Sequence, residues 1–215
     1  MQRCLFITII ILVFLIPACN NSPELADAKE KTVIEKKDSM ATTEKANDDP
    51  DPTDTIATEA YNIDTYNPTT VATVKRLLLT KYADDIKKQL IDSFSRKFIL
   101  IEYDFNSDGS KEILVGLNGS YFCGSGGCTL LLLKSNGEIV TSFSVSEIPV
   151  IVATSKTNGW NDLYIYSNKK FRVVKFDGNK YPSNPSMLPV LNTMPSDVLP
   201  RLLNVANEPY PKFTF

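Results

Sequence analysis

The chain has 215 residues, with 25 acidic and 23 basic side chains, a formal net charge of −2 and no histidine. The lack of histidine excludes Ser-His-Asp and Cys-His nucleophilic catalysis and zinc sites with histidine ligands. Basic residues are scattered rather than clustered with aromatic ones, so the sequence does not predict nucleic-acid binding.

The first predicted element is a leader at residues 1–18. An apolar run spans residues 5–16, preceded by Arg3 and followed by Pro17, Ala18 and Cys19. A basic residue, an apolar stretch and a small-residue cleavage site are the parts of a secretory signal. An uncleaved membrane anchor is the alternative, but the run is shorter than the ~20 residues that span a bilayer.

Cysteine directly after the small residue resembles the lipobox of bacterial lipoproteins. The resemblance implies cleavage before Cys19, which then carries acyl chains such as palmitate and anchors the chain in a lipid bilayer. We therefore expect a lipid-anchored protein of the bacterial cell envelope, in the outer rather than the inner membrane. The sequence leaves the periplasmic or surface face open.

Residues 19–66 are predicted to be a disordered acidic tether. Residues 20–65 carry 12 acidic and 5 basic side chains, with no aromatic one before Tyr61. This composition has too little apolar surface to offset the entropy of ordering. A helix over 24–37 is an alternative, although it lacks an apolar stripe. The remainder, 67–215, has the length of one domain and holds most of the aromatic residues.

A helix is predicted to open this domain. Asn67 and Pro68 are typical of a helix start, and apolar residues follow at spacings of three and four from Val71 to Leu90. The pattern fits one amphipathic helix, or two that are separated near 83–85. Past Tyr181, we expect an extended proline-rich stretch and then a short helix over 196–204.

Between these segments the periodicity becomes strand-like. Asn136-Gly137 and Asp177-Gly178 favour two-residue hairpin turns, and the short spacings leave no room for helical crossovers. We therefore predict an α+β fold in which the N-terminal helix packs on a mainly antiparallel β-sheet, a meander or a half-open barrel. The expected strands are 98–103, 112–117, 129–134, 139–145, 149–153, 163–166 and 171–176.

The most specific motif is the loop 104–112, Asp-Phe-Asn-Ser-Asp-Gly-Ser-Lys-Glu. Oxygen-bearing side chains alternate, as a hard cation such as Ca²⁺ requires, and glycine occupies the sixth position. Position twelve is Val115, so the loop is not an EF-hand. It resembles the calcium loops that join strands in integrin-like (FG-GAP) propellers, although a single copy excludes a full propeller. The resemblance implies a Ca²⁺ site with ligands from Asp104, Asn106, Asp108, Ser110 and Glu112.

Two other interpretations of this loop stay open. Asn, Asp and Gly favour turns in any case, so the loop could be a metal-free hairpin turn. The carboxylates of Glu102, Asp104, Asp108 and Glu112 could also include the acid/base pair of a glycosidase. Neighbours in one turn are poorly placed to flank opposite faces of a sugar, so we favour calcium.

A second motif, Tyr-Phe-Cys-Gly-Ser-Gly-Gly-Cys, covers residues 121–128. Cys123 and Cys128 are the pair that remains in an oxidising compartment, and we predict a disulfide that closes the glycine loop. The spacing fits neither a zinc site nor a Cys-x-x-Cys redox motif. The segment is similar to small uncharacterised bacterial envelope lipoproteins. We expect Tyr121, Phe122 and Ser125 to contact a partner, on a surface where this loop meets the calcium loop.

Trp160 is the only tryptophan of the chain and lies in a predicted turn. It could stack on a sugar and join the partner-binding residues, but a tryptophan beside a strand more often anchors the core. Together these features predict a non-catalytic, calcium-stabilised domain that binds an envelope protein or a glycan. The alternatives are a carboxylate-based glycan hydrolase and a protein resembling lysozyme inhibitors, although the Ser-Gly-x-x-Tyr loop of one such family is missing.

Overall fold

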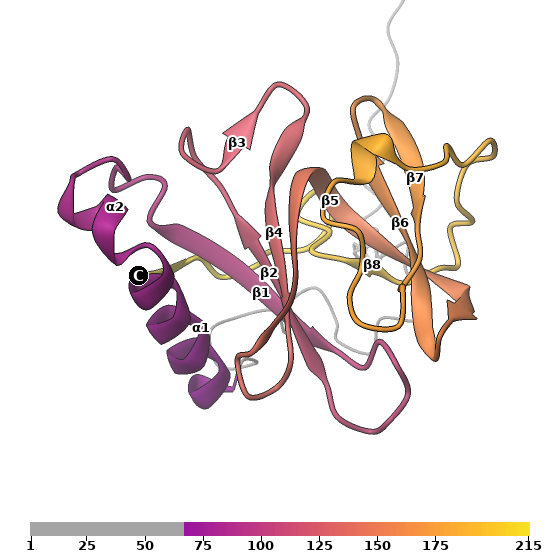
Figure 1. Cartoon of the computed structure of the whole chain (residues 1–215), viewed down its shortest axis with the longest axis horizontal. Helices are drawn as coiled ribbons and strands as arrows, with labels where there is room; N and C mark the ends of the chain where they lie inside the picture. Colours follow the sequence, from indigo (N-terminus) through magenta and orange to yellow (C-terminus); the bar gives the residue numbers. More distant parts are fainter. Residues whose placement is uncertain (1–66) are drawn as a thin grey trace, which may run out of the picture. The chain divides into compact units, whose positions relative to one another are not determined.

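A computed structural model describes residues 67–215; the predicted leader, Cys19, the tether and the alternative helix over 24–37 lie outside the described residues. The described part combines two helices with a large sheet (Figure 1). Its elements are α1 (Pro68–Lys81), α2 (Ala83–Lys87), β1 (Lys97–Tyr103), β2 (Glu112–Leu117), β3 (Cys123–Gly124), β4 (Gly127–Leu133), β5 (Ile139–Thr157), β6 (Trp160–Ser167), β7 (Lys170–Val174), a 3₁₀ turn η3 (Pro185–Met187), β8 (Arg201–Leu202) and β9 (Phe213–Thr214).

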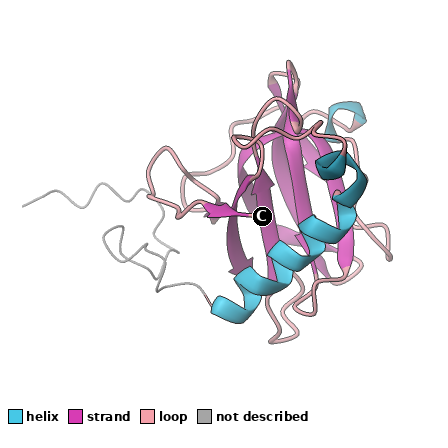
Figure 2. Cartoon of the chain, turned by 90° about the vertical axis from the view of Figure 1, so that its left-hand side faces the viewer, coloured by secondary structure: helices cyan, strands magenta, loops and turns pink. Residues whose placement is uncertain are grey.

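Helix α1 begins where the sequence predicts. The Asn67 side chain accepts the backbone N–H of Thr69, and Pro68 occupies the first turn, where its missing N–H costs nothing. The helix ends at Tyr82, and α2 follows separately, so the amphipathic segment forms two helices. Figure 2 shows α1 lying across the sheet, and the Thr70 hydroxyl donates to Glu102 of β1 at 2.7 Å.

The sheet is antiparallel at every described pairing, in the order β7-β6-β5-β4-β2-β1-β9, with β3 added to β4 and β8 to β5. This confirms the predicted α+β class, with a helix on a mainly antiparallel sheet. All six residues of β2 are buried. Since a strand alternates its side chains between two faces, the sheet is covered on both sides at its centre.

Strand β5 corrects one expectation. The segments 139–145 and 149–153 are predicted as two strands, but they belong to one strand of 19 residues. Its first part pairs with β4 and its second with β6, with register shifts along both pairings. Val145, with a φ of 54°, bends the strand near the end of the part that pairs with β4, and the Ile148–Pro149 peptide is cis. Because a strand can change partners at such a bend, proline need not end it.

The C-terminal helix expected over 196–204 is wrong. Arg201 and Leu202 instead pair with β5 as strand β8, and Leu202 is buried. The Arg201 guanidinium donates to the carbonyl oxygens of Ser196, Asp197 and Leu199 and so closes a turn in place of a helix. Burial of Leu202 and Leu203 against the sheet outweighs the weak helical pattern.

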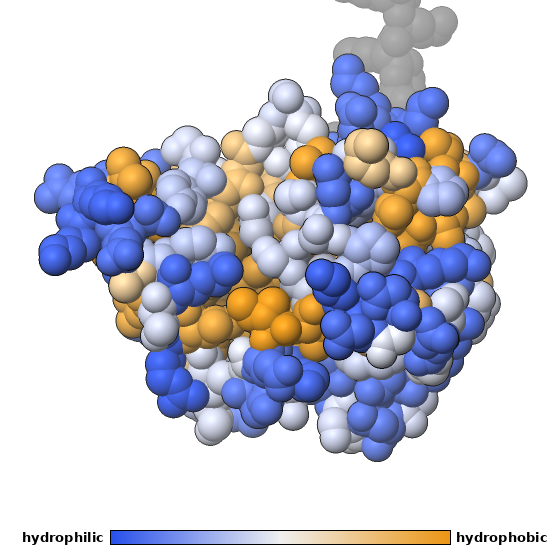
Figure 3. Space-filling view, viewed as in Figure 1, coloured by the Kyte–Doolittle hydropathy of each residue, from blue (hydrophilic) through white to orange (hydrophobic). Residues whose placement is uncertain are grey.

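The surface of the described domain is mixed. In the view of Figure 3, hydrophilic side chains cover the α2 end, and hydrophobic surface shows in the middle, between α1 on the left and the β6–β7 hairpin on the right. Neither helix of residues 67–215 is long and apolar enough to cross a membrane.

Candidate functional site

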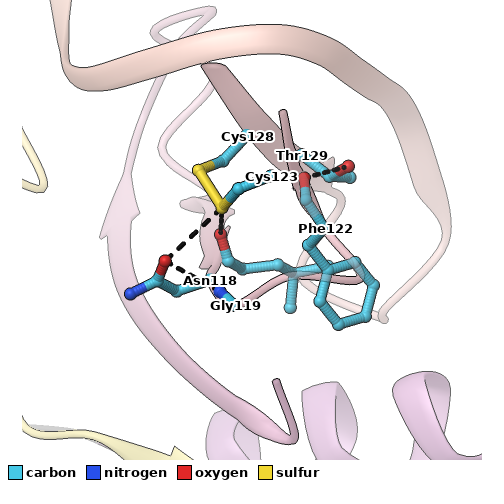
Figure 4. Close-up of a disulfide and its surroundings, with 7 residues drawn as sticks. Asn118, Gly119, Phe122, Cys123, Cys128 and Thr129 are labelled. Carbon is cyan, nitrogen blue, oxygen red and sulfur yellow. Dashed lines mark hydrogen bonds between the residues drawn. A yellow bond between two sulfur atoms is a disulfide. The ribbon is translucent and has the colours of Figure 1, made fainter. Parts of the chain in front are cut away.

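The β3–β4 hairpin carries a disulfide between Cys123 and Cys128, which confirms the predicted pair (Figure 4). The two cysteines face each other in the strand register, as do Gly124 and Gly127. The backbone N–H of Thr129 donates to the carbonyl of Phe122 just below the bridge. The hairpin is therefore held by a covalent bond and by the backbone hydrogen bonds between its two strands.

Glycine is needed where this hairpin meets the bend of β5. A Cβ atom at Gly127 would lie 2.6 Å from the backbone nitrogen of Ser146, and the residue has a φ of 130°. A Cβ atom at Gly126 would lie 2.6 Å from Cγ1 of Val145. Only glycine permits this approach of two backbones without displacement. The glycines of the loop that the disulfide closes thus let the hairpin pack closely on β5.

A groove of about 520 Å³ lies beside the hairpin. Its lining comes from four separate parts of the chain: the hairpin segment, the bend of β5, the β6–β7 turn and η3. None of the lining residues carries a formal charge. They are Tyr121, Phe122, Cys123, Gly124, Ser125, Gly126, Gly127, Thr129, Ser144, Val145, Asn168 and Ser186.

Tyr121 and Phe122 differ in exposure. Tyr121 is 36% exposed, and its hydroxyl donates to Asp85 of α2 at 2.6 Å. This hydrogen bond raises the pKa of Tyr121. Phe122 is only 6% exposed and packs edge-on against Tyr82. Phe122 thus lines the groove, but most of its ring packs in the core and little of it is left to contact a partner.

The loop 104–112 folds around the Asp104 carboxylate. Its two oxygens accept backbone N–H groups of Asn106, Ser107, Asp108 and Gly109, at 2.6 to 3.3 Å. Desolvation raises the pKa of Asp104, but these N–H groups outweigh it and the pKa falls below its ordinary value. The arrangement is the turn chemistry that Asp, Asn and Gly favour.

The other predicted metal ligands extend this network. Asp108 accepts the side-chain amide of Asn106 at 2.8 Å and the backbone N–H of Ser110 at 2.7 Å. Glu112 is 4% exposed and accepts the backbone N–H of Phe105 at 2.9 Å. Within 67–215, no group of three or more His, Cys, Asp or Glu side chains is arranged to hold a metal ion.

Glu112 is a buried carboxylate with two other carboxylates of the loop close enough to affect its pKa. Desolvation raises its pKa, and the charges of Asp108 and Asp104 raise it further. A cation does reach the loop: the Lys156 ammonium donates to the Asn106 carbonyl at 3.2 Å and to the Ser107 hydroxyl at 2.6 Å. Sequence analysis missed Lys156, because it comes from the far end of β5 and no local pattern links it to the loop.

The disulfide hairpin and the loop 104–112 lie at opposite ends of β2. The loop precedes Glu112, the hairpin follows Leu117, and these strand ends are about 17 Å apart at the rise of a β-strand. Figure 1 shows β3 at the top of the sheet and the β1–β2 loop at the bottom. The prediction that the two loops meet in one surface is therefore wrong.

Trp160 lies away from the groove. Its ring stacks on Phe176 at 4.6 Å and packs edge-on against Tyr181, and it contacts the hydrophobic core. The structure thus agrees with the core-anchor interpretation and separates Trp160 from Tyr121 and Ser125. Asn168, Ser144 and Ser186, by contrast, line the groove but show no sequence signal, since each lies in a different turn or strand.

Of the carboxylates proposed for a glycosidase, Glu102 and Glu112 lie on opposite faces of the sheet. Glu102 faces α1, where it accepts the Thr70 hydroxyl. Glu112 pairs with Tyr103 in the β1–β2 register and so belongs to the other face of the sheet. A sugar ring held between the two side chains would have to occupy the sheet itself.

Comparisons of the chain with protein-family models, with curated proteins and with solved structures found no match.

Proposed function

We propose that the chain is a lipid-anchored lipoprotein of the bacterial cell envelope whose folded domain binds a partner without catalysis. The observation that carries the proposal is the uncharged groove beside the disulfide hairpin. Its hydroxyl and amide groups can exchange hydrogen bonds, and the exposed Tyr121 ring offers an aromatic platform at its edge. None of its lining residues is a carboxylate or an amine that would serve as a general acid or base at neutral pH.

A glycan suits this lining better than a charged partner. Ser125, Ser144, Asn168 and Ser186 can both donate and accept, as sugar hydroxyls do. A strongly charged ligand would find no opposite charge in the groove. The hairpin that forms one wall is stiffened by its disulfide and by close contact with β5, so little ordering is needed on binding.

We also propose that Ca²⁺ binds the loop 104–112 through Asp104, Asn106, Asp108, Ser110 and Glu112. The support is the chemistry of the donors: oxygen side chains at alternate positions, next to the buried carboxylate of Glu112. A bound divalent cation would offset the mutual repulsion that raises the pKa of Glu112. Calcium would stabilise this end of the sheet rather than contact the partner, since the groove lies at the other end.

Lipid attachment at Cys19 rests on the leader sequence and its resemblance to the lipobox. The disulfide fits an oxidising compartment, where such bonds persist. Substitution of Cys19 by Ala should leave an unprocessed precursor without lipid, whereas the parent should incorporate radioactive palmitate. A parent recovered without lipid from a bacterial host would refute the anchor.

Glycan binding is tested by passing the full chain, solubilised from membranes, over immobilised neutral oligosaccharides and peptidoglycan. The parent should be retained, and Tyr121→Ala should bind up to about tenfold more weakly, the range of one aromatic contact. Phe94→Ala is the matched control, because Phe94 is 60% exposed and lies outside the groove.

Two results would contradict the binding proposal. Equal weakening by both substitutions would show that the groove plays no part. Turnover of a glycan that disappears in Glu102→Gln or Glu112→Gln would favour the hydrolase instead.

A further inference from the structure

A second, larger cavity of about 630 Å³ lies on the face of the sheet opposite α1. Its floor includes Ile99 and Gly116, which face each other in the β1–β2 register, and Leu130 of β4. Glu102, which contacts α1, belongs to the other face, since it is an odd number of residues from Ile99. The C-terminal segment 205–212 forms the opposite wall. The cavity and the groove both reach β4 and the bend of β5, but no residue lines both of them.

Apolar side chains remain exposed at the edge of this cavity. Phe94 is 60% exposed and Val205 is 50% exposed, although both line the cavity together with buried apolar residues. Ile148 continues the apolar lining toward β5. A partly open, mainly apolar space of this volume, with apolar residues left in water at its mouth, is typical of a site for a small ligand with an apolar part.

Two ammonium groups lie at one side of the cavity. Lys97 begins β1 and faces Thr214 of β9, and Lys212 is two residues before Thr214. By the two-residue period of a strand, both lysines project to the same side of this pair. Among the described residues, neither has a carboxylate within 4 Å. The Lys97 ammonium lies over the Phe94 ring, 5.8 Å from its centroid, at the edge of the cavity.

The lining also carries two carboxylates, Glu147 and Glu208, so its formal charges balance. Glu208 is 4% exposed, and its carboxylate accepts the Tyr210 hydroxyl at 2.5 Å. Glu147 belongs to β5, which is three strand spacings from β1, or about 14 Å. The exposed ammonium groups of Lys97 and Lys212 thus lie at the β1 and β9 side, whereas Glu208 is buried against Tyr210 and Glu147 lies toward β5.

We propose that this cavity binds a single-chain amphiphile with an anionic head, specifically a long-chain fatty acid. The aliphatic chain lies on Ile99, Leu130 and Ile148, and the carboxylate lies between Lys97 and Lys212. The cavity corresponds to about 20 water molecules at ~30 Å³ each, room for one chain rather than for a two-chain lipid. This site is separate from the proposed glycan groove and does not depend on it.

The test uses the full chain in isolated membranes and a palmitate analogue that carries a mid-chain photoreactive diazirine. After irradiation, mass spectrometry of the purified protein should find label on peptides that contain Leu130, Ile148 or Val205. Excess unlabelled palmitate should remove the label, and hexadecylamine, of the same chain length but opposite charge, should compete much less well.

Variants of exposed residues test the assignment further. Val205→Trp should close the mouth and abolish labelling, whereas Val198→Trp, at an equally exposed position outside the cavity, should not. Lys97→Gln with Lys212→Gln should reduce affinity three- to tenfold, the range for two surface charge contacts. Resistance to proteolysis, compared with the parent, shows that each variant is folded.

Label that is spread over the surface, or that persists in folded Val205→Trp, would overturn the proposal. Equal competition by hexadecylamine and palmitate would overturn it as well, because the lysines would then play no part.

Discussion

The hairpin at one end of β2 and the loop at its other end are held together in different ways. The β3–β4 hairpin is joined by a disulfide and packed on β5, and no charged residue lines its groove. The loop 104–112 concentrates three carboxylates and is ordered by hydrogen bonds from its own backbone and from Lys156. The disulfide at the first end does not respond to calcium or ionic strength, whereas the carboxylates make the second end depend on ions and pH.

The largest expected effect comes from Phe122→Ala. Truncation of a ring that is 6% exposed leaves a cavity and should lower the free energy of unfolding by about 3–5 kcal/mol. Tyr121→Ala, at the neighbouring position, should cost far less, since its ring is partly in water. Urea titration of both variants measures the difference. Similar losses of stability in the two variants would show that the rings of Phe122 and Tyr121 contribute equally to the core.

Calcium should act only at the opposite end. At a hundred times the dissociation constant, it should add ~2.7 kcal/mol to the free energy of unfolding by mass action. Asp108→Ala should abolish this gain, while Asp197→Ala, at an exposed carboxylate outside the loop, should retain it. Thermal unfolding with calcium or chelator is the measurement. An unchanged melting temperature together with no heat of binding would refute the calcium site.

Loss of the disulfide should have a comparable but calcium-independent effect. Cys123→Ser with Cys128→Ser frees a six-residue loop in the unfolded chain, which costs about 2 kcal/mol by the chain-entropy relation. The calcium shift should remain intact, because the hairpin lies at the other end of β2. In the exported parent, alkylation without reductant should leave both cysteines unlabelled, and two labelled cysteines would refute the pairing.

The smallest effect concerns acid sensitivity at the hairpin end. The pKa of Asp92 is lowered by the backbone N–H of Ser95 and by the hydroxyl of Ser120. A lowered pKa gives stability that is present above the ordinary value near 3.9 and is lost as pH falls through the folded value. Asp92→Asn should therefore be less stable than the parent at neutral pH and lose less stability on acidification.

Asp84→Asn is the matched control, because the Asp84 side chain accepts none of the described hydrogen bonds. Denaturant midpoints between pH 2 and pH 7 compare the three proteins. If Asp92→Asn and the parent lose stability in parallel, the hydrogen bonds from Ser95 and Ser120 do not make stability depend on the protonation of Asp92.

Local patterns predicted a good part of the fold. Asn67 and Pro68 start α1 as expected, and the strands expected over 98–103, 112–117 and 129–134 are found as β1, β2 and β4 of the antiparallel ladder. The errors fall where distant segments decide the conformation. Strand β5 continues through Pro149 because it changes partners there, and Arg201 and Leu202 are extended because β5 offers them a ladder.

For the candidate site, the sequence by itself determined the chemistry of each motif, and the tertiary structure decided which motifs meet. The cysteine spacing and the glycines between them predicted the stapled hairpin, because five residues of chain suffice to bring the pair together. The tertiary structure then placed this hairpin and the loop 104–112 at opposite ends of β2, turned Phe122 toward the core and brought Asn168 and Ser186 to the groove. Such contacts join residues tens of positions apart, and they depend on strand order and bending that no local pattern encodes.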